Sequence, residues 1–287
     1  MNSAEALKIN STIYLNPKMN VMLLQQIADL QPVILVGLII LLYSIETWFP
    51  YFQKPGNKKQ HDTQNFILSA LSFVTNGLIG LAVLYMVNLT ASQHLGLLNK
   101  VTLADPVKII LSILLLDFGS YCFHNLQHRV PILWKFHRVH HSDLHLNTSS
   151  ALRFHPIDVI LSQGIFFCIW IPIIGVPISA FIIYTTVALA FVVIQHTNLK
   201  FPAWIEKYGR YVFSTPGWHK IHHAKDQKFT DSHYGDVFTF WDRIFGPWHQ
   251  VQPEDIEFGL KEFEQNERQK AAFLIRSPFV DILLYPW

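Results

Sequence analysis

The chain has 287 residues, of which 51% are hydrophobic and only 15% are charged. Its mean hydropathy of +0.25 excludes an ordinary soluble domain and indicates a membrane protein. The net charge of +2 is too small to indicate nucleic-acid binding.

Apolar runs predict the membrane-spanning segments. Residues 1–31 lack the pattern of a cleaved signal peptide, which is a basic segment, an apolar core and a small-residue cleavage site. The runs lie at residues 32–50, 66–89, 107–123, 157–174 and 178–194. The first is just long enough to cross a hydrocarbon core of roughly 30 Å. Gly175-Val176-Pro177 predicts a tight turn between the last two runs.

These runs predict an all-α fold: an integral membrane bundle of about four to five transmembrane helices with a cytosolic, histidine-rich helical cap. We treat the chain as one domain with three segments. Residues 1–106 hold the N-terminal segment and the first two spans, residues 107–249 hold the remaining spans and the cap, and residues 250–287 form a C-terminal tail.

Three spaced groups of histidines are the most informative feature of the sequence. His124 and His128 are four residues apart at the end of the third span, and two HxxHH groups follow. These groups are His137, His140 and His141, and then His219, His222 and His223. Residues three and four apart share a helix face, so we expect each group to direct its rings at a common point. Pro131 and Pro216 are placed to begin the two HxxHH helices, with Thr215 as an N-cap.

The positions of the spans require all three groups to lie on one side of the membrane. The fourth span leaves the histidine side and the fifth returns to it, ending at His196, which we favour as a ninth ligand. The loop on that side carries Lys54, Lys58 and Lys59, so the positive-inside rule predicts a cytosolic histidine face and an outside N-terminus.

Other polar residues are expected to support this site. Asp117 and Tyr121 continue the stripe of His124 and His128 along the third span, and a carboxylate in a span indicates function. We expect Asp117 to accept a hydrogen bond from a histidine N–H.

The remaining histidines are interpreted one by one. We interpret His155 as a supporting or structural residue and His233 as a hydrogen-bonding residue near a ligand or substrate, and we leave open whether His145 is a ligand. We interpret three further histidines as ordinary exposed residues: His61, His94 and His249.

A set of imidazoles without thiolates suits iron, zinc, copper or nickel, and eight or nine imidazoles divide into two ions. Dioxygen chemistry on a lipid is the leading interpretation. A histidine-rich membrane metal-binding or metal-transport protein is the alternative, although it predicts histidines along several spans. A membrane zinc hydrolase is less favoured, because Asn125, Leu126 and Gln127 stand where HExxH has its general base.

The order HxxxH, HxxHH, HxxHH resembles the fatty acid hydroxylase / sterol desaturase superfamily of integral membrane enzymes. The sequence segments around the histidines are similar too, including LWKFHRVHHS at 133–142, STPGWHKIHH at 214–223 and YGDVFTFWDRIFG at 234–246. The resemblance covers roughly residues 107–249. One position departs from it, because the family usually has Asn before Tyr234-Gly235 and this chain has His233.

The resemblance implies a non-haem di-iron centre, with zinc as a possible occupant of purified protein. It implies as ligands His124, His128, His137, His140, His141, His196, His219, His222 and His223. It also implies dioxygen-dependent hydroxylation or desaturation of a lipid of the sterol, fatty acyl, sphingoid or alkyl-ether type. Electrons would come from a separate donor protein. The expected location is a bacterial inner membrane or the endoplasmic reticulum.

Overall fold

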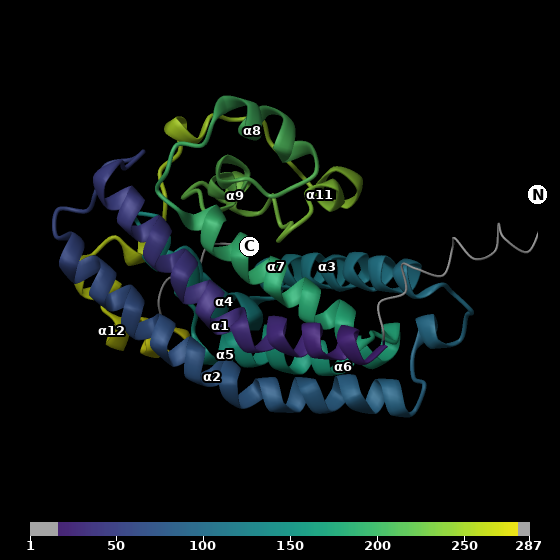
Figure 1. Ribbon diagram of the computed structural model, residues 1–287. Coiled ribbons are helices and arrows are strands. Elements are labelled where there is room, and N and C mark those ends of the chain that lie inside the picture. The colour runs from purple at the N-terminus through teal and green to yellow at the C-terminus, as the bar shows by residue number, and fades with distance from the viewer. Residues whose placement is uncertain (1–16, 281–287) are drawn as a thin grey trace, which may run out of the picture.

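A computed structural model describes residues 17–280 as a helical bundle with a cap of short helices at one end (Figure 1). The long helices are α1 (Pro17–Trp48), α2 (Lys58–Ser92), α3 (Asp105–Arg129) and α7 (Ile178–His196). A further long helix, Pro156–Ile174, consists of α5 (Pro156–Val159), a π-helical segment η4 (Ile160–Ile165) and α6 (Phe166–Ile174). Within the described residues, five helices are long and apolar enough to cross a membrane, which confirms the predicted all-α, multi-pass fold.

The predicted spans lie within these helices, but the first two helices begin earlier than the apolar runs, since α2 begins at Lys58 and not at Phe66. We predicted a start at Pro32, but α1 begins at Pro17 and contains Pro32, and its apolar span is Asp29–Trp48. Pro32 therefore lies inside a helix instead of starting one. The signal-peptide prediction falls largely on residues 1–16, which are outside the described part of the chain.

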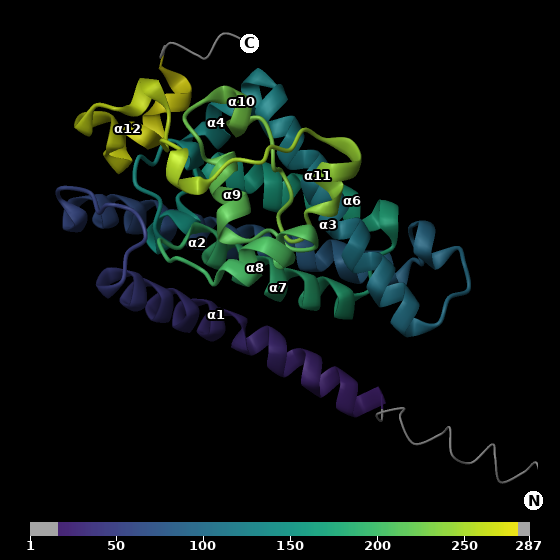
Figure 2. The ribbon, with the colours of Figure 1, turned by 90° about the horizontal axis from the view of Figure 1, so that it is seen from above.

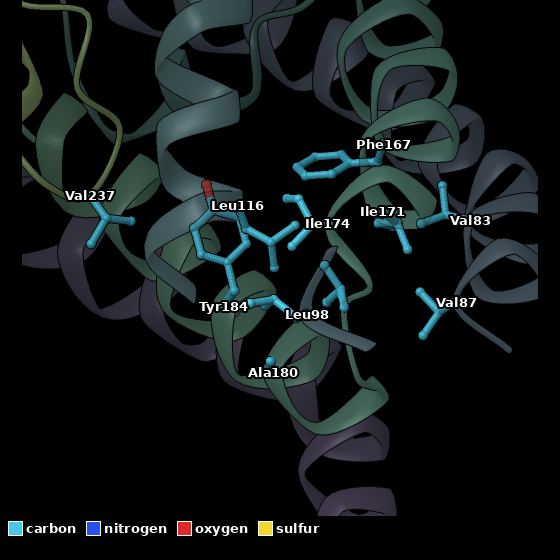
Figure 3. Packing of buried hydrophobic residues seen from close by; sticks show 11 residues of the cluster. Val83, Val87, Leu98, Leu116, Phe167, Ile171, Ile174, Ala180, Tyr184 and Val237 are labelled. Carbon is cyan, nitrogen blue, oxygen red and sulfur yellow. The ribbon is translucent and has the colours of Figure 1, made fainter. Parts of the chain in front are cut away.

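The spans meet around one apolar core, drawn in Figure 3. The approach of α3 and α6 depends on Gly119, because a Cβ there would lie 2.1 Å from the Trp170 ring nitrogen. That nitrogen donates to the Leu115 carbonyl at 2.9 Å. The other core side chains come from α2, α3, α6 and α7 and include Val83, Val87, Leu116, Ile171, Ile174, Ala180 and Tyr184.

The turn between α6 and α7 is tight, as predicted. Gly175 ends α6 with φ 88°, in the left-handed region that glycine adopts without cost. A Cβ at this position would lie 2.8 Å from the Leu95 carbonyl oxygen. Gly175 therefore permits both the turn and its contact with the segment after α2.

Short helices form the cap around the ends of α3 and α7 (Figures 1 and 2). They are α4 (Pro131–His141), α8 (Ala203–Tyr208), α9 (Pro216–His222), α10 (Gln227–Thr230), α11 (Phe240–Phe245) and α12 (Ala271–Arg276). Pro131 and Pro216 stand at the first turns of α4 and α9, and the Thr215 hydroxyl accepts from the Trp218 N–H, as predicted.

The cap also extends along the bundle. Phe118 lies near the middle of α3, and its ring lies 4.9 Å from Trp241 and 5.5 Å from Phe245 of α11. The segment after residue 250 packs back as well, since Leu260, Phe263 and Leu274 share a buried cluster with Leu68 of α2 and Trp134 of α4. The cap is thus held on several sides.

Candidate metal centre

The nine histidines named from the sequence gather into two buried clusters. The five-histidine cluster consists of His124, His128, His137, His141 and His222. The four-histidine cluster consists of His140, His196, His219 and His223. In each cluster, one ring nitrogen from every residue lies within 4.8 Å of the others, so each cluster is arranged to hold one ion.

Each HxxHH group is divided between the clusters. His137 and His141 face the five-histidine cluster, whereas His140 faces the other. Likewise His219 and His223 share one cluster and His222 joins the opposite one. Our expectation of a common point for each HxxHH group was therefore wrong. Successive helical residues are about 100° apart, so the i, i+4 pair keeps one face and the third ring turns away.

The distances between ring nitrogens fit metal ligation. The Nε2 atoms of His222 and His124 are 3.0 Å apart, and those of His137 and His141 are 3.3 Å apart. In the other cluster, His196 Nε2 lies 3.1 Å from His140 Nε2 and 3.1 Å from His223 Nε2. Nitrogens about 2.1 Å from one ion lie roughly 3.0–3.4 Å from each other.

Burial keeps these imidazoles in the form that binds metal. The Nε2 atom of His128 is buried and has no hydrogen-bond partner, as expected for an unused ligand atom. Burial, followed by the neighbouring rings, holds the pKa values of His140 and His222 well below the ordinary value. Neutral imidazole is the ligand form, so the donor set fits a bound transition metal.

Two carboxylates hold the outward nitrogens of the five-histidine cluster. Asp158, at the start of the fourth span, lies 3.1 Å from His137 Nδ1. Asp231 lies 3.2 Å from His128 Nδ1. Such partners fix the tautomer of a ligating histidine and raise its basicity. We missed both residues, although an acidic residue at the start of an apolar run was a signal for Asp158.

Backbone carbonyls hold other rings. His124 Nδ1 donates to the Tyr234 carbonyl at 2.9 Å, and His222 Nδ1 donates to the Ser232 carbonyl at 2.7 Å. In the four-histidine cluster, His196 Nδ1 donates to the Val192 carbonyl at 2.7 Å. These bonds place the proton on Nδ1 and leave Nε2 as the ligand atom.

Asp117 does not have the histidine partner that we expected. Its carboxylate accepts from the Val237 and Phe238 N–H groups at 3.2 and 3.3 Å and from Trp241 Nε1 at 2.8 Å. It therefore fixes the chain that follows Tyr234. Tyr121 is buried beside this segment, with its ring 6.3 Å from that of Tyr234.

His233 and His155 lie outside both clusters. His233 has φ 58°, a left-handed conformation in which Asn and His are enriched, which accounts for either residue at this position. Its Nε2 accepts from the His249 N–H at 2.8 Å. His155 Nδ1 accepts from the Ile157 N–H, and its Nε2 lies 3.1 Å from the Ile275 carbonyl, so its contacts are structural.

The three histidines expected to be exposed differ from one another. His94 is exposed, but His249 is half-buried. His61 is also half-buried, with its Nε2 2.7 Å from Asp143. His145, whose role we left open, joins neither cluster, and its N–H donates to the Asp143 carboxylate at 3.0 Å. A network around Asp143 thus supports the turn after α4.

A pocket lies against both clusters. Its volume is about 90 Å³, and α3, the fourth span and α7 form its walls. His124 and His137 of one cluster and His196 and His219 of the other line it. A small molecule in this pocket would therefore lie beside both candidate ions.

Comparisons with known proteins identify a family and several relatives that resemble this chain. Residues 109–247 match the family model described as fatty acid hydroxylase. Alkylglycerol monooxygenase from Xenopus tropicalis is 32% identical over 152 residues, which cover 52% of this chain and 32% of that protein. Ornithine lipid hydroxylase from Rhizobium tropici is 28% identical over 53% of this chain and 45% of its own length. Human cholesterol 25-hydroxylase is 26% identical over 48% of this chain and 50% of its own length.

The matched region spans about a third of the alkylglycerol monooxygenase and about half of the other two relatives. No solved structure matches the chain. The relatives are named as a monooxygenase and as hydroxylases, so they are oxidoreductases. Residues 109–247 therefore match the fatty acid hydroxylase family, which confirms the resemblance inferred from the histidine motifs.

Proposed function

We propose that the protein is a membrane-bound di-iron oxygenase that hydroxylates or desaturates a C–H bond of a lipid. The observation that carries this proposal is the pair of buried imidazole clusters at one end of an apolar helical bundle. Hydroxylation converts C–H, O₂, two electrons and two protons into C–OH and water. Desaturation uses O₂, two electrons and two protons as well, removes two hydrogens from the lipid, and yields a C=C bond and two waters. A separate electron-carrier protein supplies the electrons.

The donor set supports iron in both clusters. All nine inward ligands are imidazoles, which suit iron, zinc, copper and nickel. Iron, when bound, would supply the activation of dioxygen. Zinc fits the same donors but has no redox activity, so zinc-loaded protein should oxidise no lipid. The five-histidine and four-histidine clusters would hold one iron each.

Residues around the clusters orient the ligands and exclude water from the candidate metal centre. Asp158 and Asp231 orient His137 and His128 through their Nδ1 atoms. The burial of the rings excludes water from the candidate ions and keeps the imidazoles neutral. The apolar spans would deliver the lipid directly to the pocket beside both clusters.

The names of the relatives support a lipid substrate and a membrane location. An alkylglycerol, an ornithine lipid and cholesterol differ in shape but share a long apolar part. We propose that the histidine side faces the cytosol, because Lys54 lies between α1 and α2 and Lys58 and Lys59 begin α2 at that end.

The test combines metal analysis with lipid profiling. Protein purified from iron-replete cells should hold about two iron ions per chain. Cells with the active protein should contain a lipid that differs by one added oxygen or two lost hydrogens, and cells with His222→Ala should not. Iron-loaded protein that changes no lipid, or a lipid product formed without a transition metal, would refute the proposal.

A further inference from the structure

The pocket beside the clusters is small for a lipid. Its volume is about 90 Å³, whereas a cavity of about 150 Å³ in another protein holds one benzene molecule. Only a few heavy atoms of the substrate can enter it. The rest of the lipid must stay outside, along the spans.

The wall of this pocket is unusually polar for a site that receives a lipid. Besides five histidines, seven polar and four apolar residues line it. Most of the polar side chains are already engaged with the protein. Ser120 donates to the Asp236 carboxylate, Gln127 donates to Asp158 at 2.7 Å, and Ser162 donates to the Asp158 carbonyl at 2.8 Å. They hold the pocket's shape and have less capacity for a ligand.

Gln163 differs from these polar residues because its side chain is not engaged with the described part of the protein. Within residues 17–280 its amide has no protein hydrogen-bond partner, and its side chain is exposed. The other exposed side chains of the fourth span are apolar: Ile160, Ile165, Ile169 and Ile173. An amide that faces hydrocarbon without a partner costs a few kcal/mol. A polar group of the substrate would remove this cost.

The backbone at Gln163 is also irregular. Residues Ile160–Ile165 form a π-helical segment between α5 and α6. A π-helical turn carries an extra residue, which changes the phase of the side chains that follow it, and such segments are frequent at functional sites. Phe166, which follows the segment, packs on Phe123 of α3 with ring centroids 4.9 Å apart. Both rings line the pocket next to Gln163.

We propose that Gln163 binds a polar oxygen of the lipid and that the oxidised carbon lies only a few bonds from that oxygen. This inference rests on the proposed function. The substrate class is an amphiphile that is oxidised next to its headgroup and not at the far end of its tail. The small pocket limits the distance between the bound oxygen and the reacting carbon, and the stoichiometry remains that of hydroxylation or desaturation given above.

The test uses the lipid product of wild-type cells, whose modified carbon is located by fragmentation in a mass spectrometer. We expect it within about three bonds of a headgroup oxygen. Gln163→Leu keeps the side chain's size and should lower product formation about tenfold, through a higher apparent KM. Gln163→Asn, which keeps an amide, should restore part of the rate. Iron content should be unchanged in both variants.

Ile165→Leu is the matched control, because Ile165 is exposed in the same π-helical segment but does not line the pocket. It should keep the wild-type rate. A wild-type rate for Gln163→Leu, or a modified carbon far along the tail, would overturn the inference and leave the proposed function intact. Iron-loaded wild-type protein with no oxidised lipid would overturn both.

Discussion

The two histidine clusters are built from the same residue type but are supported differently. In the five-histidine cluster, the outward nitrogens of His124, His128, His137 and His222 have oxygen partners, and that of His141 is buried without one. In the four-histidine cluster, His196 has one, whereas the Nδ1 atoms of His140 and His219 are buried without a partner. The His140 ring instead stacks on Phe154, with centroids 4.2 Å apart.

This difference predicts that the two clusters bind metal with different affinity and rigidity. Carboxylate and carbonyl partners hold imidazoles in one orientation and make them stronger donors. Rings that are held by packing alone can adjust to a changing coordination number. We therefore expect the five-histidine cluster to bind its iron more tightly, and the four-histidine cluster to be the more adaptable centre.

Removal of a ligand from either cluster should have the largest effect. His222→Ala deletes a ligand of the five-histidine cluster, and His140→Ala deletes one of the four-histidine cluster. Each should reduce activity below detection and lower iron to about one ion per chain, because a centre that needs both ions fails when one is lost. Activity and iron are measured on the same membrane-inserted protein.

His94→Asn is the control for these variants. His94 is exposed with φ 49°, and Asn tolerates that left-handed conformation. It should keep both ions and full activity. Full activity in either cluster variant would count against the ligand assignment.

Asp158→Asn should have the next largest effect. The change keeps the side chain's size but replaces a carboxylate 3.1 Å from His137 Nδ1 with a neutral amide. Loss of such a partner lowers metal affinity or activity by roughly 10- to 100-fold. The loss of iron affinity is measured as the iron that the protein retains during titration with a chelator. Asp255→Asn, at an exposed position, is the control; equal retention in the two variants would remove the proposed role of Asp158.

The sequence predicted the ligands better than it predicted their distribution. Spacing places His137, His140 and His141 on one general side of a helix, and topology brings three distant groups to one end of the bundle. The 100° step between helical residues separates His140 from the pair His137 and His141, but we did not apply it, and the cluster that His140 joins depends on where α7 and α9 pack. The clusters exist only in the tertiary arrangement.

Some of the groups that support the ligands could also be predicted from the sequence, and others could not. Asp117 and Asp158 both stand out as acidic residues in apolar runs, and applying one criterion to both would have found the second. The carbonyls of Ser232 and Tyr234 could not be predicted as hydrogen-bond acceptors from the sequence, because every residue has a backbone carbonyl. Their positions follow from the loop's conformation, which Asp117 and Asp242 fix from either side.

Asp242 should make the stability of this loop depend on pH. It accepts from the Tyr234 N–H at 2.7 Å and the Gly235 N–H at 3.1 Å, and burial raises its pKa from 3.8 to about 7. The folded state therefore binds this proton more tightly than the unfolded state does. Its contribution to stability is complete below about pH 4 and is lost as pH rises through about 7.

Between pH 5 and pH 8 this group alone should lower the free energy of unfolding by about 2–3 kcal/mol. Asp242→Asn cannot ionise, so its unfolding midpoint in detergent should change less over that range than the wild-type midpoint. The other titrating groups are common to both proteins, and the difference between the two slopes isolates Asp242. Parallel slopes would show that the carboxyl does not bind a proton in the folded state.

Trp241→Phe should give the smallest effect and the sharpest distinction between the clusters. It removes the hydrogen bond from Nε1 to Asp117 at 2.8 Å but keeps an aromatic ring against Phe118. The loss should be about 1 kcal/mol in the free energy of unfolding.

The loop that Trp241 and Asp117 hold supplies carbonyls to His124 and His222, both in the five-histidine cluster. Trp241→Phe should therefore speed the loss of iron from that cluster, while the iron held by the four-histidine cluster is released at the wild-type rate. Chelator release followed in His140→Ala and His222→Ala backgrounds separates the two irons. Trp248→Phe, at a more exposed ring, should alter neither. Equal acceleration of both releases would mean that the loop stabilises the whole centre, and the two clusters would not then be independently supported.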